Sequence, residues 1–167
     1  AYAVDYNLAS FASGTFNWDA PGLWSPAGLP GAADRLVLNG DPAGAITVNY
    51  SGSGVVTRSI ESISVTDTVV AAMSNVAFRP GVSGSGLQFS TATPSVSTNL
   101  INVASGAQRL MVSTPLFQPG STFTKGGNGS VNLHFEIGSS ATSWNNNVTS
   151  LLSSGGGSIV NFSSVSY

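Results

Sequence analysis

Short stretches in which apolar and polar residues alternate recur along this chain and constrain its fold more than any other feature. The clearest is 131–137, Val-Asn-Leu-His-Phe-Glu-Ile, in which every odd-numbered position is apolar and every even-numbered one polar. Side chains of a β-strand point alternately to its two faces, so this stretch would bury one face and expose the other. Further stretches of this kind lie at 46–50, 63–65, 87–89, 101–103 and 110–112. Clusters of Gly, Pro, Asn and Ser separate them, and the pattern predicts an all-β protein of many short strands.

The apolar positions of these stretches also predict the core. Each lies on the face of its strand that holds the other apolar residues, and that face should point inward. The predicted core residues are Ile63, Val65, Leu87, Phe89, Ile101, Val103, Leu133 and Phe135. A chain of 167 residues is expected to form a single domain, and it is long enough to bury such a core.

Both ends of the chain have the composition of strands beside flexible segments. At the start, alternate residues from Tyr2 to Leu8 are apolar, and the residues between them are small or polar. Residues 158–167 are rich in apolar side chains and follow three consecutive glycines, which are typical of a hinge. The predicted organisation is an N-terminal strand and connector at 1–14, a β-rich body at 15–154 and a Gly-hinged C-terminal strand at 155–167.

The first of these strands has no evident hairpin partner nearby in the sequence. Residues 10–14 form a short connector with Ala, Ser and Gly that would let the strand swing away from its own chain. The apolar residues Tyr2, Val4, Tyr6 and Leu8 are therefore candidate assembly residues, which would add a strand to the exposed sheet edge of a neighbouring subunit. An ordinary first strand that pairs within its own chain is the alternative.

Charge is scarce, because only 7% of the residues are charged and the formal net charge is −2. The five basic residues are scattered, which argues against nucleic acid as a partner. The chain has no Cys, so it forms no disulfide. No apolar stretch approaches the ~20 residues of a membrane helix, and we expect no membrane insertion. The first residue is Ala1 rather than Met, which is typical of a secreted protein after removal of its signal peptide.

Two segments of the chain resemble a family of secreted bacterial proteins. The first segment contains, in order, Asn17-Trp18, Gly22-Leu23-Trp24, the run Gly-Leu-Pro-Gly-Ala-Ala-Asp at 28–34, Leu36-Val37-Leu38 and the strand-like stretch 59–65. The second, 122–133, is similar to a repeat of the form Leu-Thr-Lys-x-Gly-x-Gly-x-Leu-x-Leu, although residues 127–129 shift its glycine spacing. Together they resemble autotransporter-type passenger proteins with autotransporter-associated β-strand repeats.

This resemblance implies a right-handed parallel β-helix that is secreted and serves adhesion or surface architecture. It carries over no catalytic residue, and Lys125 of the repeat would be structural. Physical reasoning agrees, because a solenoid stacks short strands and places Gly or Asn at its tight corners. A β-sandwich or a jelly roll also contains many short strands, and side-chain periodicity does not distinguish parallel from antiparallel pairing. Both architectures therefore stay open.

No group of residues in the sequence forms an evident catalytic, cofactor-binding or metal-binding site. The acidic residues form no Asp-x-Asp or Asp-Asp run, which favours solvated or turn carboxylates. His134 is the single histidine and lies on the polar face of its strand, where a surface role is the simpler interpretation. One His without Cys does not make the usual zinc site. We therefore predict a non-enzymatic protein without cofactors.

Three tryptophans, Trp18, Trp24 and Trp144, offer flat aromatic faces of the kind that bind sugar rings. Packing in the core or in an N-terminal cap is the favoured interpretation for the first two. The leading hypothesis is a secreted structural or adhesive surface protein, with self-association into filaments as its mode of assembly. A carbohydrate-binding module or a polysaccharide-acting β-helix protein is one alternative, and a viral capsid or fibre protein is another.

Overall fold

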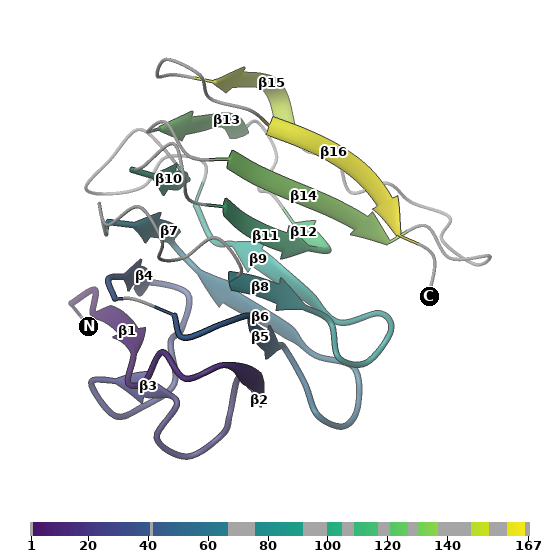
Figure 1. The fold of residues 1–167 in the computed structure, drawn as a ribbon. Coiled ribbons are helices and arrows are strands. Elements are labelled where there is room, and N and C mark those ends of the chain that lie inside the picture. The colour runs from purple at the N-terminus through teal and green to yellow at the C-terminus, as the bar shows by residue number, and fades with distance from the viewer. Residues whose placement is uncertain are drawn as a thin grey trace.

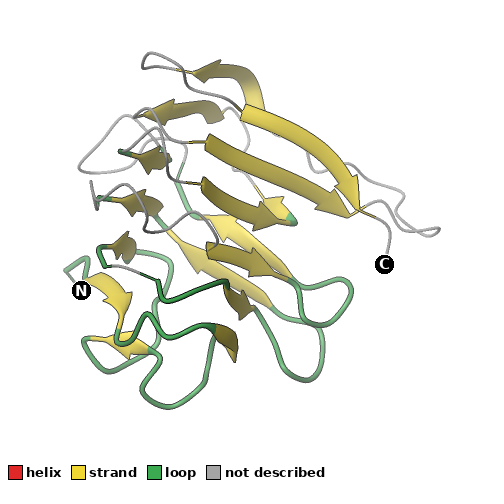
Figure 2. Cartoon of the chain, viewed as in Figure 1, coloured by secondary structure: helices red, strands yellow, loops and turns green. Residues whose placement is uncertain are grey.

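The computed structural model describes residues 2–40, 42–66, 76–91, 100–104, 109–116, 121–126, 130–136, 148–153 and 160–165. At 109, 121–126, 130, 132, 134–136, 148–153 and 160–165 it describes the backbone alone. All regular structure in these residues is β-strand, and Figure 2 shows no helix among them. The prediction of an all-β protein is therefore confirmed.

The strands form three sheets. The seven-stranded sheet has the order β15 (Val148–Ser153), β13 (Ser121–Gly126), β10 (Ile101–Val103), β7 (Ser62–Val65), β4 (Arg35–Leu38), β1 (Asp5–Leu8) and β3 (Trp24–Ser25). The six-stranded sheet has the order β16 (Val160–Val165), β14 (Ser130–Glu136), β11 (Arg109–Ser113), β8 (Val76–Arg79), β5 (Ile46–Asn49) and β2 (Gly14–Asn17). The three-stranded sheet has the order β12 (Pro115–Leu116), β9 (Gly86–Phe89) and β6 (Thr57–Ile60).

From β4 to β14, consecutive strands belong to different sheets, so this part of the chain visits the three sheets in turn. In the ladders up to β14, parallel neighbours are three positions apart along the chain, as in β4 and β7 or β5 and β8. The last two pairs, β13 with β15 and β14 with β16, are two positions apart. Parallel neighbours need a crossover connection, and here the strands of the other two sheets form it. Among the described strands, β1 and β3 make the one antiparallel pair. Figure 1 shows the resulting stack, from the purple β1 and β2 to the yellow β16.

Residues in register across one sheet form columns, and alternate columns are buried. One column of the six-stranded sheet contains Val48, Phe78, Val112 and Leu133, each at most 1% exposed. Apolar side chains of the other two sheets complete the core in the same way, such as Leu36 beside Ile63 and Ile60 beside Phe89. Because the strands are only two to seven residues long, the core is built by stacking rather than by any single long element.

Most predicted core residues are confirmed. Ile63, Val65, Leu87, Phe89, Ile101, Val103 and Leu133 are all buried. The side chain of Phe135 lies outside the described residues. The strand predicted at 131–137 is β14, and strands also form near both ends of the chain, as β1 and β16.

The turns that follow β5 and β8 lie against each other. The Tyr50 amide donates to the Arg79 carbonyl oxygen at 2.7 Å, and the Ser51 amide donates to the Pro80 carbonyl oxygen at 3.3 Å. Gly81 then adopts φ +71°, in the left-handed region that favours glycine. A Cβ at this position would collide with the carbonyl oxygen of Ser51, so both the backbone angle and the space select glycine.

Candidate interaction surface at the N-terminal end

The three sheets all terminate at one end of the stack, in β3, β2 and β6. We call this the N-terminal end. A strand with a neighbour on one side only presents unpaired N–H and C=O groups on the other, which makes it a template for another strand. Natural proteins protect such edges with short strands, prolines, charges or covering loops. The three edge strands of this end differ in how far they are protected.

The edge of the seven-stranded sheet is protected by the short antiparallel strand β3. Its two residues pair with Asn7 and Leu8 of β1, and the Ala9 amide donates to the Leu23 carbonyl oxygen at 2.9 Å. Pro26 follows directly, and its nitrogen carries no hydrogen to donate. A further strand would therefore find little backbone to pair with here.

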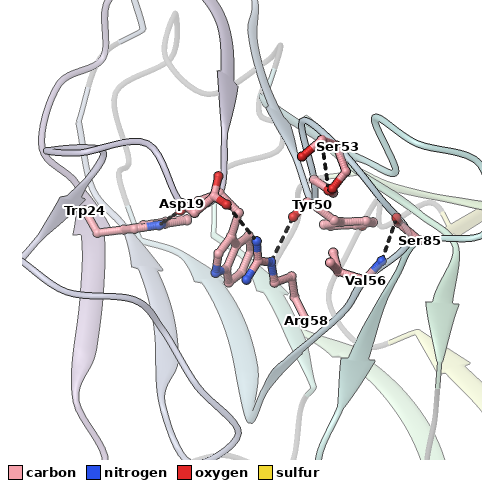
Figure 3. A network of polar contacts seen from close by, with 9 residues as sticks. Asp19, Trp24, Tyr50, Ser53, Val56, Arg58 and Ser85 are labelled. Carbon is pink, nitrogen blue, oxygen red and sulfur yellow. Dashed lines mark hydrogen bonds and ion pairs between the residues drawn. The ribbon is translucent and has the colours of Figure 1, made fainter.

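The edge of the three-stranded sheet is covered by the charged side chain of Arg58. Arg58 is in register with Leu87, which is in register with Pro115, and both are buried, so Arg58 occupies the last position of an interior column. Its Nε donates to the Tyr50 carbonyl oxygen at 2.8 Å, and its Nη2 lies 3.4 Å from Asp19 Oδ2 (Figure 3). A partly exposed ion pair adds little stability. Its effect is to place charged groups where another strand would have to bind.

Aromatic side chains fill the interior behind these two edges. The Trp18 ring lies edge-on to Trp24, Tyr50 and Phe78, with centroids 4.8, 6.4 and 6.2 Å away. Trp24 Nε1 donates to the Trp18 carbonyl oxygen at 2.7 Å, while Trp18 Nε1 has no partner among the described residues. The two indoles are 0% and 3% exposed, so neither presents a face to a sugar ring. Trp144 lies outside the described residues.

The edge of the six-stranded sheet, β2, is protected neither by a paired strand nor by a charged side chain, although the Asn17 carbonyl oxygen accepts from the Ala20 amide at 2.9 Å. It is four residues long and contains neither a proline nor a charged residue. The amides of Gly14 and Trp18 donate toward β5, to the carbonyl oxygens of Ala45 and Asn49 at 3.0 and 2.8 Å. Because N–H groups alternate in direction along a strand, the amides of residues 15 and 17 point to the free side.

A pocket of about 140 Å³ adjoins β2. Its lining residues are Ser10, Ala12, Phe16, Ala20, Pro21, Gly22 and Leu23. Phe16 is in register with Val48 and ends that buried column, yet it is only half-buried. The pocket is therefore a place where the column ends without a full cover, and no charged residue lines it.

The described carboxylates have structural partners. Asp5 Oδ1 lies 2.5 Å from Arg35 Nε, and this hydrogen bond raises the pKa of Arg35 above its ordinary value. Asp34 accepts hydrogen bonds from the amides of Val4 and Gly31, at 2.9 and 2.8 Å. Glu61 is buried. Asp5 and Asp34 therefore each link two segments that lie 30 positions apart in the chain.

Some of the charged residues and the histidine considered in the sequence analysis lie outside the described residues. The positions concerned are Asp41 and Asp67 and the side chains of Lys125, His134 and Glu136. Within the described part of the chain, no group of three or more His, Asp or Glu residues is arranged to hold a metal ion. No helix of that part is long and apolar enough to cross a membrane.

The four candidate assembly residues do not share one environment. Tyr6 and Leu8 are buried in the core of their own chain, Val4 is half-buried, and Tyr2 is 98% exposed. Only Tyr6 and Leu8 belong to β1, which begins at Asp5 and lies between β4 and β3 of the same chain, so the observed strand is shorter than the one predicted from Tyr2. The sequence indicated no hairpin partner for the first strand. In the structure β3 is its antiparallel partner, and β3 is too short to show a strand pattern in the sequence. Exchange of β1 between subunits would break both pairings, and it stays a prediction.

No family model, curated protein or solved structure matches this chain significantly. The likeness of its motifs to autotransporter-type passenger proteins therefore stays a prediction from the sequence.

Proposed function

We propose that the chain is a right-handed parallel β-helix. Support comes from the order in which the chain visits the three sheets and from the parallel pairing of strands three positions apart. Sandwiches and jelly rolls pair their strands mainly in antiparallel fashion, which makes them poorer explanations of this pattern. The stacked buried columns are what a solenoid needs, because each of its coils contacts only its neighbours.

We further propose that the protein is a secreted, non-enzymatic structural or adhesive building block that associates with copies of itself. The observation that carries this proposal is the free, uncharged edge of β2 beside edges that are blunted. An exposed edge strand either promotes aggregation or serves as the surface through which a specific partner strand is bound. The resemblance to secreted passenger proteins supports the extracellular location.

The absence of catalysis is part of the same proposal. Asp5, Asp19 and Asp34 each bind an arginine or backbone amides, so they are poorly placed to exchange protons with a substrate. We expect no turnover when the protein is incubated with a panel of acidic and neutral polysaccharides and reducing ends are counted. Turnover that a single Asp→Asn substitution abolishes would contradict this proposal.

Self-association is tested with the wild-type chain by sedimentation velocity over a wide range of concentration and by electron microscopy. We expect a sedimentation coefficient that rises with concentration, and filaments at the upper end. Far-UV circular dichroism should show β-structure at every concentration, so that ordered association is distinguished from aggregation of unfolded chain. A monomer at all concentrations would refute the proposal.

A variant lacking residues 1–9 tests the exchange of the first strand. Because β1 pairs with β3 and β4 and buries Tyr6 and Leu8, its removal should destabilise the monomer. A truncated chain that folds but no longer associates would support exchange. A truncated chain that folds and associates normally would exclude it.

A further inference from the structure

We infer that the free edge of β2, with the adjoining pocket, is the docking site for strand β16 of a second copy of this chain. The two copies would then share one continuous parallel sheet. This inference rests on the proposed self-association and deepens it by naming the surface and the occupant.

The first argument is the continuity of the six-stranded sheet. β2 and β16 are the strands at its two edges. All neighbouring strands of this sheet, from β2 to β16, pair in parallel. A second copy placed beyond β2 in the same orientation therefore meets it with a strand of the right direction. No other described sheet has parallel strands at both of its edges in so long a ladder, because the seven-stranded sheet ends in the antiparallel β3.

The second argument is the register of the column that ends at the pocket. From one edge of the sheet to the other, the residues in register are Phe16, Val48, Phe78, Val112, Leu133 and Phe162. The same register across the joint would set Phe162 of the second copy beside Phe16. The column would continue from one copy into the next, at the place where Phe16 is now only half-covered.

The third argument is charge. Neither β2 nor the pocket contains an ionisable side chain, and β16 has the uncharged sequence Val-Asn-Phe-Ser-Ser-Val. The joint therefore contains no like-charge repulsion and requires no desolvation of an ion. An anionic polymer or a metal ion would find no partner of opposite charge there. A neutral strand with apolar side chains fits this surface best.

The mode of contact follows from these features. β2 of one copy would meet β16 of the next, so the contact joins two different surfaces. Head-to-tail contacts of this kind generate open filaments unless the rotation between copies closes a ring. Arg58 and β3 would limit the contact to one side of the end, along the six-stranded sheet.

Disulfide trapping tests the pairing directly, because the chain has no cysteine of its own. The proposed register places residue 15 of one copy beside residue 161 of the next. We therefore mix Thr15→Cys with Asn161→Cys under mild oxidation and expect a covalent dimer of the two variants. Neighbouring strands lie about 4.8 Å apart, within the range of Cα separations that a disulfide spans. Asn161→Cys mixed with Ala33→Cys, whose substituted residue is exposed in a turn, is the matched control.

A second test removes the free edge without a crosslink. Thr15→Pro deletes the outward N–H but leaves the amides of Gly14 and Trp18 that bind β5. We expect association at least about tenfold weaker than in Thr15→Val, which keeps the N–H. Ala12→Glu places a charge in the pocket and should weaken association similarly, whereas Ala33→Glu should not. If Thr15→Pro fails to fold by circular dichroism, Ala12→Glu decides.

The outcomes separate this inference from the proposal on which it rests. A trapped dimer of the Thr15→Cys and Asn161→Cys pair, together with weaker association of the edge variants, supports the docking site. A wild-type chain that associates while the edge variants associate equally well overturns the docking site and leaves self-association intact. A wild-type chain that never associates overturns both.

Discussion

The close approach of Gly81 to Ser51 predicts how much unfolding free energy is lost when this glycine of the stacked turns is replaced. Gly81 has φ +71°, and a Cβ there would meet the carbonyl oxygen of Ser51 and approach Asn49 Cβ to 2.8 Å. Gly54 has almost the same angle, +74°, but nothing lies within 4 Å of its Cβ position. The pair Gly81→Ala and Gly54→Ala therefore separates the cost of the backbone angle from the cost of the collision.

The expected magnitudes differ for a physical reason. Alanine in the left-handed region costs about 1–2 kcal/mol, and this is the whole effect expected for Gly54→Ala. Gly81→Ala adds about 1–3 kcal/mol, as for other overpacked sites, so its total loss should be about 2–5 kcal/mol. The carbonyl of Ser51 belongs to the backbone, so no change of rotamer relieves the collision.

Urea denaturation monitored by circular dichroism measures both variants against the wild type. For a domain of this size, each kcal/mol should also lower the melting temperature by about 2–4 °C. If the two variants lose the same free energy of unfolding to within about 0.5 kcal/mol, the turns do not stack as described. A loss confined to Gly81→Ala would instead show that the left-handed angle is cheap in this chain.

Three further substitutions test the core and the surface. Leu133→Ala should lower the free energy of unfolding by about 2–5 kcal/mol, because it empties a buried site; a loss under half a kcal/mol, by the same denaturation assay, would show that Leu133 is not buried. Tyr50→Phe should cost about 1–3 kcal/mol, since its hydroxyl donates to the buried Ser113 carbonyl oxygen at 2.6 Å, and an unchanged unfolding midpoint would argue against that bond. Asp5→Asn should cost only about 0.2–1 kcal/mol, because the ion pair with Arg35 is partly exposed. Asp5 raises the pKa of Arg35, so the stability from Arg35 is complete below arginine's ordinary pKa and lost only as the pH rises through the raised value; a titration near neutrality should show no loss from this arginine.

Strands whose side chains alternate strictly could be predicted from the sequence, and those without alternation could not. The stretch now seen as β14 alternates along its whole length and was recognised from that alone. The strand β8 is not predictable from alternation, because Ala77 is buried beside Val76 and Phe78 and the residues therefore show no period of two. The strand β3 is not predictable either, because its two residues are too few to show any period. The direction of pairing was out of reach, since parallel and antiparallel strands place their side chains alike.

The polar contacts at the N-terminal end could not be predicted from the sequence either, for a different reason. In the stretch Thr-Arg-Ser-Ile of β6, Arg58 reads as a surface residue. Its interior position becomes visible only when Leu87 and Pro115 stack in register with it. The bond from Arg58 to Asp19 joins residues 39 positions apart, and no local pattern connects them. The sequence does predict that Trp18 and Trp24 would pack in this region, and they do.

The paired indoles of Trp18 and Trp24 also give one end of the molecule an optical signature. Both rings are shielded from water, so their fluorescence should be blue-shifted while this end is intact, and their close contact should contribute to the near-UV circular dichroism. Stacked proteins can open from an end while the remainder stays folded. Fraying at residues 18–24 would then shift the emission to the red before the far-UV signal changes.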